Sequence, residues 1–283
     1  MRTPRIIERG QGRPIVVVPG LQGRYEWGVP TVEALASFGR VVTFSLADEP
    51  TSGFAWSEPA GFENYLTQLD EVIRATGIER PVLVGISYGG LIAAEYAARH
   101  PGVLSALVVA SSPPPVWRLP ARAERYLKAP RLMAPVFWIG APLRAYPELR
   151  ASLPERSDRW QFVRDQGLRI AGAPASSARM VRRLRWLASA AFSLDRPIDV
   201  PALIVTGEPG LERVVPPADT LQYRTWLPGA RVVTLPDTGH NGTVMKAREF
   251  AAAVAGLLAE APAASPAGAA TRPIPQPETV RAH

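Results

Sequence analysis

The chain has 283 residues, a formal net charge of +7 and 47% hydrophobic residues. This length suits one large α/β domain with an insertion or two small domains, and the apolar content is enough for a substantial core. The absence of cysteine excludes disulfides, thiol catalysis and cysteine-ligated metal sites. The positive charge is not accompanied by a recognisable binding module, so we expect no nucleic-acid partner.

The first residues, Met1 to Arg5, lead into no long apolar run, and no apolar stretch of the sequence is long enough to span a bilayer. We therefore expect neither a signal peptide nor a transmembrane segment, with the cytoplasm as the default compartment. No feature of the sequence specifies an oligomeric state.

Short runs rich in Val, Ile and Leu alternate with helix-like stretches along the chain. The predicted strands are 15–18, 41–45, 82–84, 104–109, 202–206 and 232–235, with a possible edge strand at 5–8. The predicted helices are 62–75, 88–99 and 246–258. Because these strands do not alternate with polar residues, they indicate a mostly parallel sheet covered by helices on both faces.

The segment from about residue 112 to 200 breaks this rhythm. It contains four of the seven tryptophans and fifteen arginines and one lysine against seven acidic residues. Its pattern is helical, so we predict an all-helical cap at 112–199 inserted into an α/β core of 1–111 and 200–260. Residues 261–283 are rich in Ala and Pro without apolar periodicity, which predicts a disordered tail.

The segment Gly85-Ile86-Ser87-Tyr88-Gly89-Gly90 follows a predicted strand and opens a predicted helix. A Gly-x-Ser-x-Gly pattern alone is weak, because composition alone could produce it. In a strand-to-helix context it indicates a nucleophile elbow, a sharp turn that exposes the serine hydroxyl. Glycines two residues before and after Ser87 are needed because side chains there would collide with the neighbouring strand and helix.

With these features residues 5–260 resemble the α/β-hydrolase superfamily, of the kind with a single domain and a helical cap. The elbow is the specific part of this resemblance, and the strand order is generic. The resemblance implies that Ser87 is the nucleophile of a serine hydrolase.

Three histidines are available for a general base. His283 lies in the predicted tail, and His100 ends the helix after the elbow, where a structural role at the helix terminus is the better interpretation. His240 follows the predicted strand 232–235 in a Gly-His pair, where the resemblance places the catalytic base. Its imidazole can take the serine proton and return it to the leaving group.

By the same resemblance, the oxyanion donors are the backbone N–H groups of Leu21 and Tyr88, with Gln22 as a second choice for the loop donor. Leu21 belongs to Val18-Pro19-Gly20-Leu21-Gln22-Gly23, where the family usually has His-Gly and this chain has Pro19.

The catalytic acid is harder to place, because the loop departs from the family pattern. Counting back from Val215-Pro216 places the acid at Glu212, whereas counting forward from Gly207 reaches Gly210, which cannot serve. A two-residue insertion reconciles the two counts. Glu212 is therefore preferred, and Glu208 and Asp237 remain open.

We expect a hydrolase that cleaves a carboxylic ester, lactone or thioester through an acyl-enzyme, without a cofactor or metal. An acyltransferase, a carbon–carbon bond hydrolase and a non-catalytic ligand-binding module on the same fold are the alternatives. The partner is expected to be an apolar small molecule. The arginines of the predicted cap are interpreted first as solvated helix faces and second as a contact for an anionic substrate or surface.

Overall fold

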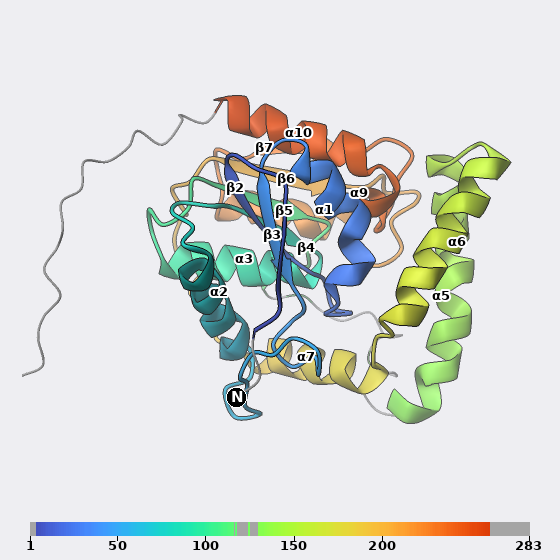
Figure 1. The fold of residues 1–283 in the computed structure, drawn as a ribbon, viewed down its shortest axis with the longest axis horizontal. Coiled ribbons are helices and arrows are strands. Elements are labelled where there is room, and N and C mark those ends of the chain that lie inside the picture. Colours follow the sequence, from blue (N-terminus) through green and yellow to red (C-terminus); the bar gives the residue numbers. More distant parts are fainter. Residues whose placement is uncertain (1–3, 116, 118–123, 125–129, 261–283) are drawn as a thin grey trace, which may run out of the picture.

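The structure, a computed structural model, describes residues 4–115, 117, 124 and 130–260. At its centre is a seven-stranded sheet in the order β1-β3-β2-β4-β5-β6-β7 (Figure 1). β1 runs antiparallel to β3, and the other neighbouring strands are parallel. The strands are β1 (Ile6–Arg9), β2 (Pro14–Val18), β3 (Arg40–Phe44), β4 (Val82–Ile86), β5 (Ala106–Ala110), β6 (Ala202–Thr206) and β7 (Arg231–Thr234).

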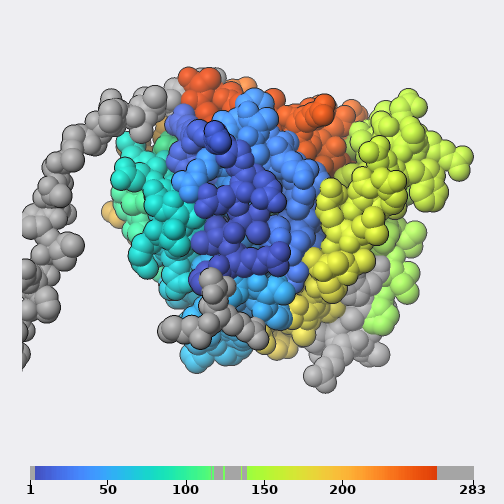
Figure 2. Space-filling model, viewed as in Figure 1, coloured from blue at the N-terminus to red at the C-terminus, as the bar shows by residue number. Residues whose placement is uncertain are grey.

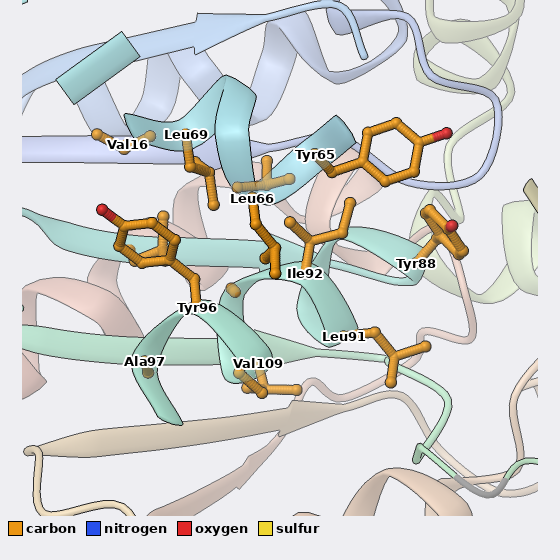
Figure 3. Packing of buried hydrophobic residues seen from close by; sticks show 14 of the residues in the cluster. Val16, Tyr65, Leu66, Leu69, Tyr88, Leu91, Ile92, Tyr96, Ala97 and Val109 are labelled. Atoms are coloured by element: carbon orange, nitrogen blue, oxygen red, sulfur yellow. The ribbon is translucent and has the colours of Figure 1, made fainter. Parts of the chain in front are cut away.

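Helices cover both faces of this sheet, as the continuous apolar strands require. Successive strand residues point to opposite faces. Val16 packs in the cluster that includes apolar residues of α2 (Glu63–Thr76) and α3 (Tyr88–Arg99). Figure 3 shows these side chains meeting between the helices and the sheet. Its neighbour Val17 packs with α1 (Val29–Ala36) and α10 (Ala247–Glu260) on the other face.

These observations confirm the predicted α/β class and mostly parallel sheet, including the edge strand. The predicted helices are present: 88–99 agrees with α3 at both ends, and the ends of the other two differ by one or two residues. Helix α1 and the short 3-10 helix η1 (Tyr25–Gly28) before it were not predicted. α1 has only eight residues, too few for a clear periodic pattern, although it carries Pro30 in its first turn. The remaining short elements are α8 (Pro217–Leu221), η2 (Gln222–Thr225) and α9 (Gly242–Met245).

Between β5 and β6 the described residues form helices and no strand. They are α5 (Pro130–Ser152), α6 (Arg156–Gly172) and α7 (Ser177–Ser189), called here the inserted helices. α5 and α6 stand at one flank of the molecule, outside the two helix layers (Figures 1 and 2). α6 is tied to the core through Trp27, whose Nε1 donates to the carbonyl of Ala173 and whose carbonyl accepts from Gln166.

The division into core, cap and tail stays a prediction, and residues 261–283 lie outside the described part of the chain. No helix among the described residues is both long enough and apolar enough to cross a membrane.

Candidate active site

Ser87 occupies the turn between β4 and α3, with φ 54° and ψ −123°. This conformation is strained for a residue with a side chain, and it persists only because the surrounding packing fixes it. The flanking glycines show why. A Cβ on Gly85 would collide with the backbone of Gly89 and Gly90, and a Cβ on Gly89 would collide with the carbonyls of Val18 and Pro19. β4, α3 and the loop after β2 therefore approach so closely that only glycine fits.

The structure brings His240 and Glu212 to this serine. Ser87 Oγ lies 3.0 Å from His240 Nε2, and His240 Nδ1 lies 3.2 Å from Glu212 Oε2. Ser87 follows β4, Glu212 lies in the loop after β6 and His240 lies in the loop after β7. All three loops are at the carboxyl edge of the parallel strands, where open α/β sheets place their ligand sites.

The apparent two-residue insertion lies in the loop after β6 that carries Glu212. The carbonyl of Glu208 accepts hydrogen bonds from the N–H groups of both Leu211 and Glu212, so residues 208–212 form a tight turn. This turn packs directly on Gly239, where a Cβ would collide with the carbonyl of Leu211. The side chain of Glu212, which is one methylene longer than that of an aspartate, thus reaches the imidazole of His240 from a turn packed against the histidine loop.

Burial and charge have opposite effects on the pKa values of Glu212 and His240. Burial raises the pKa of Glu212, but the charge and hydrogen bond of His240 and the N–H groups of Val214 and Val215 outweigh it, so the pKa is lowered. Burial lowers the pKa of His240, but the charge and hydrogen bond of Glu212 and the charge of Glu148 outweigh it, so the pKa is raised. The surroundings therefore favour a carboxylate next to an imidazole that accepts a proton readily.

The other candidates for the acid and base lie apart from this contact. Glu208 Oε1 accepts a hydrogen bond from the N–H of Asp237, at 3.2 Å on an exposed part of the loop. His100 bonds through Nδ1 to the carbonyl of Tyr96 and stacks on its ring, which is a structural role at the end of α3. His283 lies outside the described residues.

The predicted oxyanion loop runs beside Ser87. Gly20 faces the serine so closely that a Cβ there would lie 3.3 Å from Ser87 Cβ. The N–H of Gly23 donates to the carbonyl of Gly20 at 2.9 Å, so Leu21 and Gln22 are the central residues of a turn. Tyr88 is the first residue of α3, where backbone N–H groups have no partner within the helix.

Two buried charged residues of the inserted helices were not predicted. Glu148 of α5 contacts the backbone on both sides of His240, accepting from the N–H of Gly239 and the N–H of Asn241, each at 2.8 Å. Nothing in the sequence distinguishes this glutamate from a solvent-facing one, because the contact joins residues about ninety positions apart.

The second is Arg183 of α7, whose side chain is completely buried. It donates to Asp48 Oδ1 at 2.8 Å, to Glu49 Oε1 at 2.6 Å and to the carbonyl of Leu21 at 2.7 Å. The charges of Asp48 and Glu49 outweigh the desolvation that lowers its pKa, so the pKa of Arg183 is raised. α7 is thereby fixed to the predicted oxyanion loop.

Residues 13–244 match the family model described as the alpha/beta hydrolase fold. The chain belongs to the α/β-hydrolase family. A curated relative from Klebsiella pneumoniae, named "Putative carbamate hydrolase RutD", is 30% identical over 252 residues, covering 84% of this chain and 89% of that protein. A Bacillus subtilis protein named "Putative 2-succinyl-6-hydroxy-2,4-cyclohexadiene-1-carboxylate synthase" is 25% identical over 217 residues, covering 75% and 76%.

Solved structures agree on the fold. An esterase from Exiguobacterium antarcticum superposes with a TM-score of 0.72 at 18% identity, covering 90% of this α/β hydrolase and 94% of the esterase. The enol-lactonase from Burkholderia xenovorans LB400 superposes with a TM-score of 0.70 at 21% identity, covering 90% and 96%. The family membership makes this protein an α/β-hydrolase enzyme, and its activity is of that general kind.

Proposed function

We propose that this α/β hydrolase is a serine hydrolase that cleaves a carboxylic ester, lactone or thioester through an acyl-enzyme intermediate. The observation that carries the proposal is the chain of contacts from Ser87 Oγ to His240 Nε2, at 3.0 Å, and from His240 Nδ1 to Glu212 Oε2, at 3.2 Å. A strained serine at the start of a helix, next to a base that is itself oriented by a carboxylate, is the arrangement that activates a hydroxyl nucleophile.

In this mechanism Glu212 accepts a hydrogen bond from the Nδ1–H group of His240. This bond fixes the tautomer in which Nε2 carries no proton. His240 takes the proton of Ser87 as the hydroxyl attacks the substrate carbonyl, and Glu212 stabilises the imidazolium that forms. The backbone N–H groups of Leu21 and Tyr88 stabilise the negative charge that develops on the carbonyl oxygen. His240 then protonates the leaving group, which departs and leaves the acyl group on Ser87. His240 next takes a proton from water as the water attacks the acyl-enzyme, and it returns this proton to Ser87 Oγ as the bond between the serine and the acyl group breaks.

The substrate class rests on the chemistry of the site. The triad attacks carbonyl carbons that carry a leaving group, and the two relatives above bear names for a carbamate hydrolase and a synthase. A panel of esters, lactones, thioesters and carbamates of varied acyl length identifies the preferred class. Adding alcohols as competing acceptors distinguishes hydrolysis from acyl transfer, because a transferase diverts the acyl group from water.

The nucleophile is tested by labelling the full chain with a fluorophosphonate probe. Wild-type protein is expected to label at one serine, and Ser87→Ala is expected to lose both labelling and hydrolysis while keeping its fold. Loss of a triad member costs on the order of a million-fold in turnover. Full labelling of a folded Ser87→Ala variant refutes the assignment, and a wild-type protein that never labels but binds ligands supports the non-catalytic alternative.

A further inference from the structure

We propose that Glu148 is a positioning residue for the catalytic base: from the inserted helix α5 it clamps the loop of His240 and places a second negative charge beside the imidazole. The inference rests on the proposed function, since it assigns His240 as the base. It adds a second carboxylate to that site, contributed by the inserted helices and not by the strand loops that carry Ser87, Glu212 and His240.

The contacts are specific. Oε1 of Glu148 accepts from the N–H of Gly239 and the N–H of Asn241, both at 2.8 Å, and Oε2 accepts from Nδ2 of Asn241 at 2.9 Å. One carboxylate oxygen thus binds the peptide groups immediately before and after His240. Rotation of this loop about the histidine would break both bonds, so Glu148 restricts where the imidazole can lie.

Glu148 is almost completely buried, with 3% of its surface exposed. Burial raises the pKa of Glu148 above its ordinary value, and the three N–H donors and the charge of His240 reduce this rise without cancelling it. In the arrangement that the structure shows, all three partners donate, and a carboxylate accepts from each of them without adding a proton that would need an acceptor. The contact geometry therefore fits the ionised form of Glu148.

A neutral contact from the same helix provides a matched comparison. Ser152, one turn further along α5, donates through Oγ to the carbonyl of Asp237 at 2.6 Å. α5 is thus fixed to the histidine loop at two points, one charged and one neutral. Only the charged one is expected to act on the imidazole.

Two carboxylates therefore act on His240, Glu212 through a direct hydrogen bond and Glu148 through its charge. The elbow contributes the neutral Ser87, and α9 carries no charged residue. Among the side chains that the structure describes, the remaining charged groups on the neighbouring elements are Arg144 and Arg150 on α5, Glu208 and Arg213 on the loop after β6, Asp237, and Lys246 after α9. All of these are unchanged in the variants below.

The decisive variant is Glu148→Gln. Its amide oxygen can keep both backbone hydrogen bonds, and its amide nitrogen can donate to Oδ1 of Asn241 once that side-chain amide turns over. The shape and the hydrogen bonds survive and the charge is lost. We expect the pKa of His240 to fall, measured by NMR titration of a chain that has only three histidines. The pH at which the rate of fluorophosphonate labelling falls on the acid side of its pH profile should decrease by the same amount as the pKa of His240.

Glu148→Ala removes the clamp as well and leaves the two backbone N–H groups unpaired. Labelling of Ser87 is expected to slow by roughly a hundred-fold, as for a catalytic group displaced by about an ångström. Ser152→Ala is the control, and it should leave the pKa of His240 at its wild-type value.

An unchanged pKa of His240 in Glu148→Gln overturns the proposal. An equal fall of this pKa in Ser152→Ala also overturns it, because Glu148 would then only hold α5 in place. The NMR titration needs no enzymatic activity. If wild-type protein fails to label, the proposed function is wrong, while the titration still decides whether Glu148 acts on His240.

Discussion

At the scale of single residues, the balance of charge around His240 predicts how activity depends on pH. The base works only in its neutral form, and its pKa is raised because the attraction of Glu212 and Glu148 outweighs burial. The proposed reaction should therefore be slow in acid, and kcat/KM should rise with pH through a midpoint above the ordinary histidine value of 6.5. A pH profile of kcat/KM measures it, and a midpoint below that value contradicts the charge balance described here.

The identity of the acid is tested by substitutions that keep the shape. Glu212→Gln replaces the acceptor that faces His240 Nδ1 with an amide, which permits the wrong tautomer. Turnover should fall by about a thousand-fold or more. Glu208→Gln lies in the same loop and should cost much less, because its side chain bonds to the backbone of Asp237 and not to the imidazole.

Asp237→Asn completes this comparison under identical conditions. If Glu212→Gln stays active while Glu208→Gln or Asp237→Asn loses most of its turnover, the residue changed in the inactive variant is the catalytic acid. Three active variants would leave a Ser–His pair working without a carboxylate.

At the scale of the elements, helix α7 offers a matched pair of arginines. Arg183 is buried between Asp48 and Glu49, whereas Arg182 pairs with Glu58 at the surface, 3.1 Å away. Arg183→Met would remove the cation that pairs with buried Asp48, while Glu49 would keep Arg179 at 3.0 Å. We expect about 3–5 kcal/mol lower free energy of unfolding, since removing one member of a buried ion pair leaves the charge of Asp48 buried without its partner.

Arg182→Met should cost at most about 2 kcal/mol, because an exposed ion pair contributes up to about 1 kcal/mol and the guanidinium over the Trp56 ring, 4.8 Å from its centroid, about as much again. Urea unfolding of both variants measures the difference. Equal losses in the two would show that the buried cluster contributes no more than a surface pair.

At the scale of the whole molecule, we expect the folded part of the chain to end at Glu260, the last residue of α10. Phe250, Val254 and Leu257 of this helix are already buried against the sheet. Deleting residues 261–283 should leave labelling unchanged and the melting temperature within about 2 °C of the full chain, which corresponds to less than about 1 kcal/mol. A larger drop would show that the tail packs on the protein.

A second truncation ahead of Ala247 is the control for this experiment. It removes α10, one of the two helices that cover this face of the sheet, and exposes the strand residues beneath it. Loss of the folded protein in this truncation, and not in the shorter one, separates the core from the predicted tail.

The sequence by itself determined the sheet and the serine turn. Runs such as Val82–Val84 must be buried on both sides because they have no polar face, and Gly85 and Gly89 flank Ser87 because no side chain fits there. The short helix α1 escaped prediction because eight residues hold too little periodicity. The burial of the strands and the glycines around Ser87 are local properties, so short sequence patterns predict them.

Only the tertiary structure decided which acid faces His240 and which charged residues of the inserted helices are buried. The turn at Glu208 that presents Glu212 depends on its packing against Gly239, and the contacts of Glu148 and Arg183 join segments that lie about 90 and 135 positions apart. An isolated glutamate or arginine in a helix sequence carries no sign of its partners. Its burial is fixed by how the inserted helices pack on the sheet, because a charge leaves water only where the fold supplies opposite charge and hydrogen bonds.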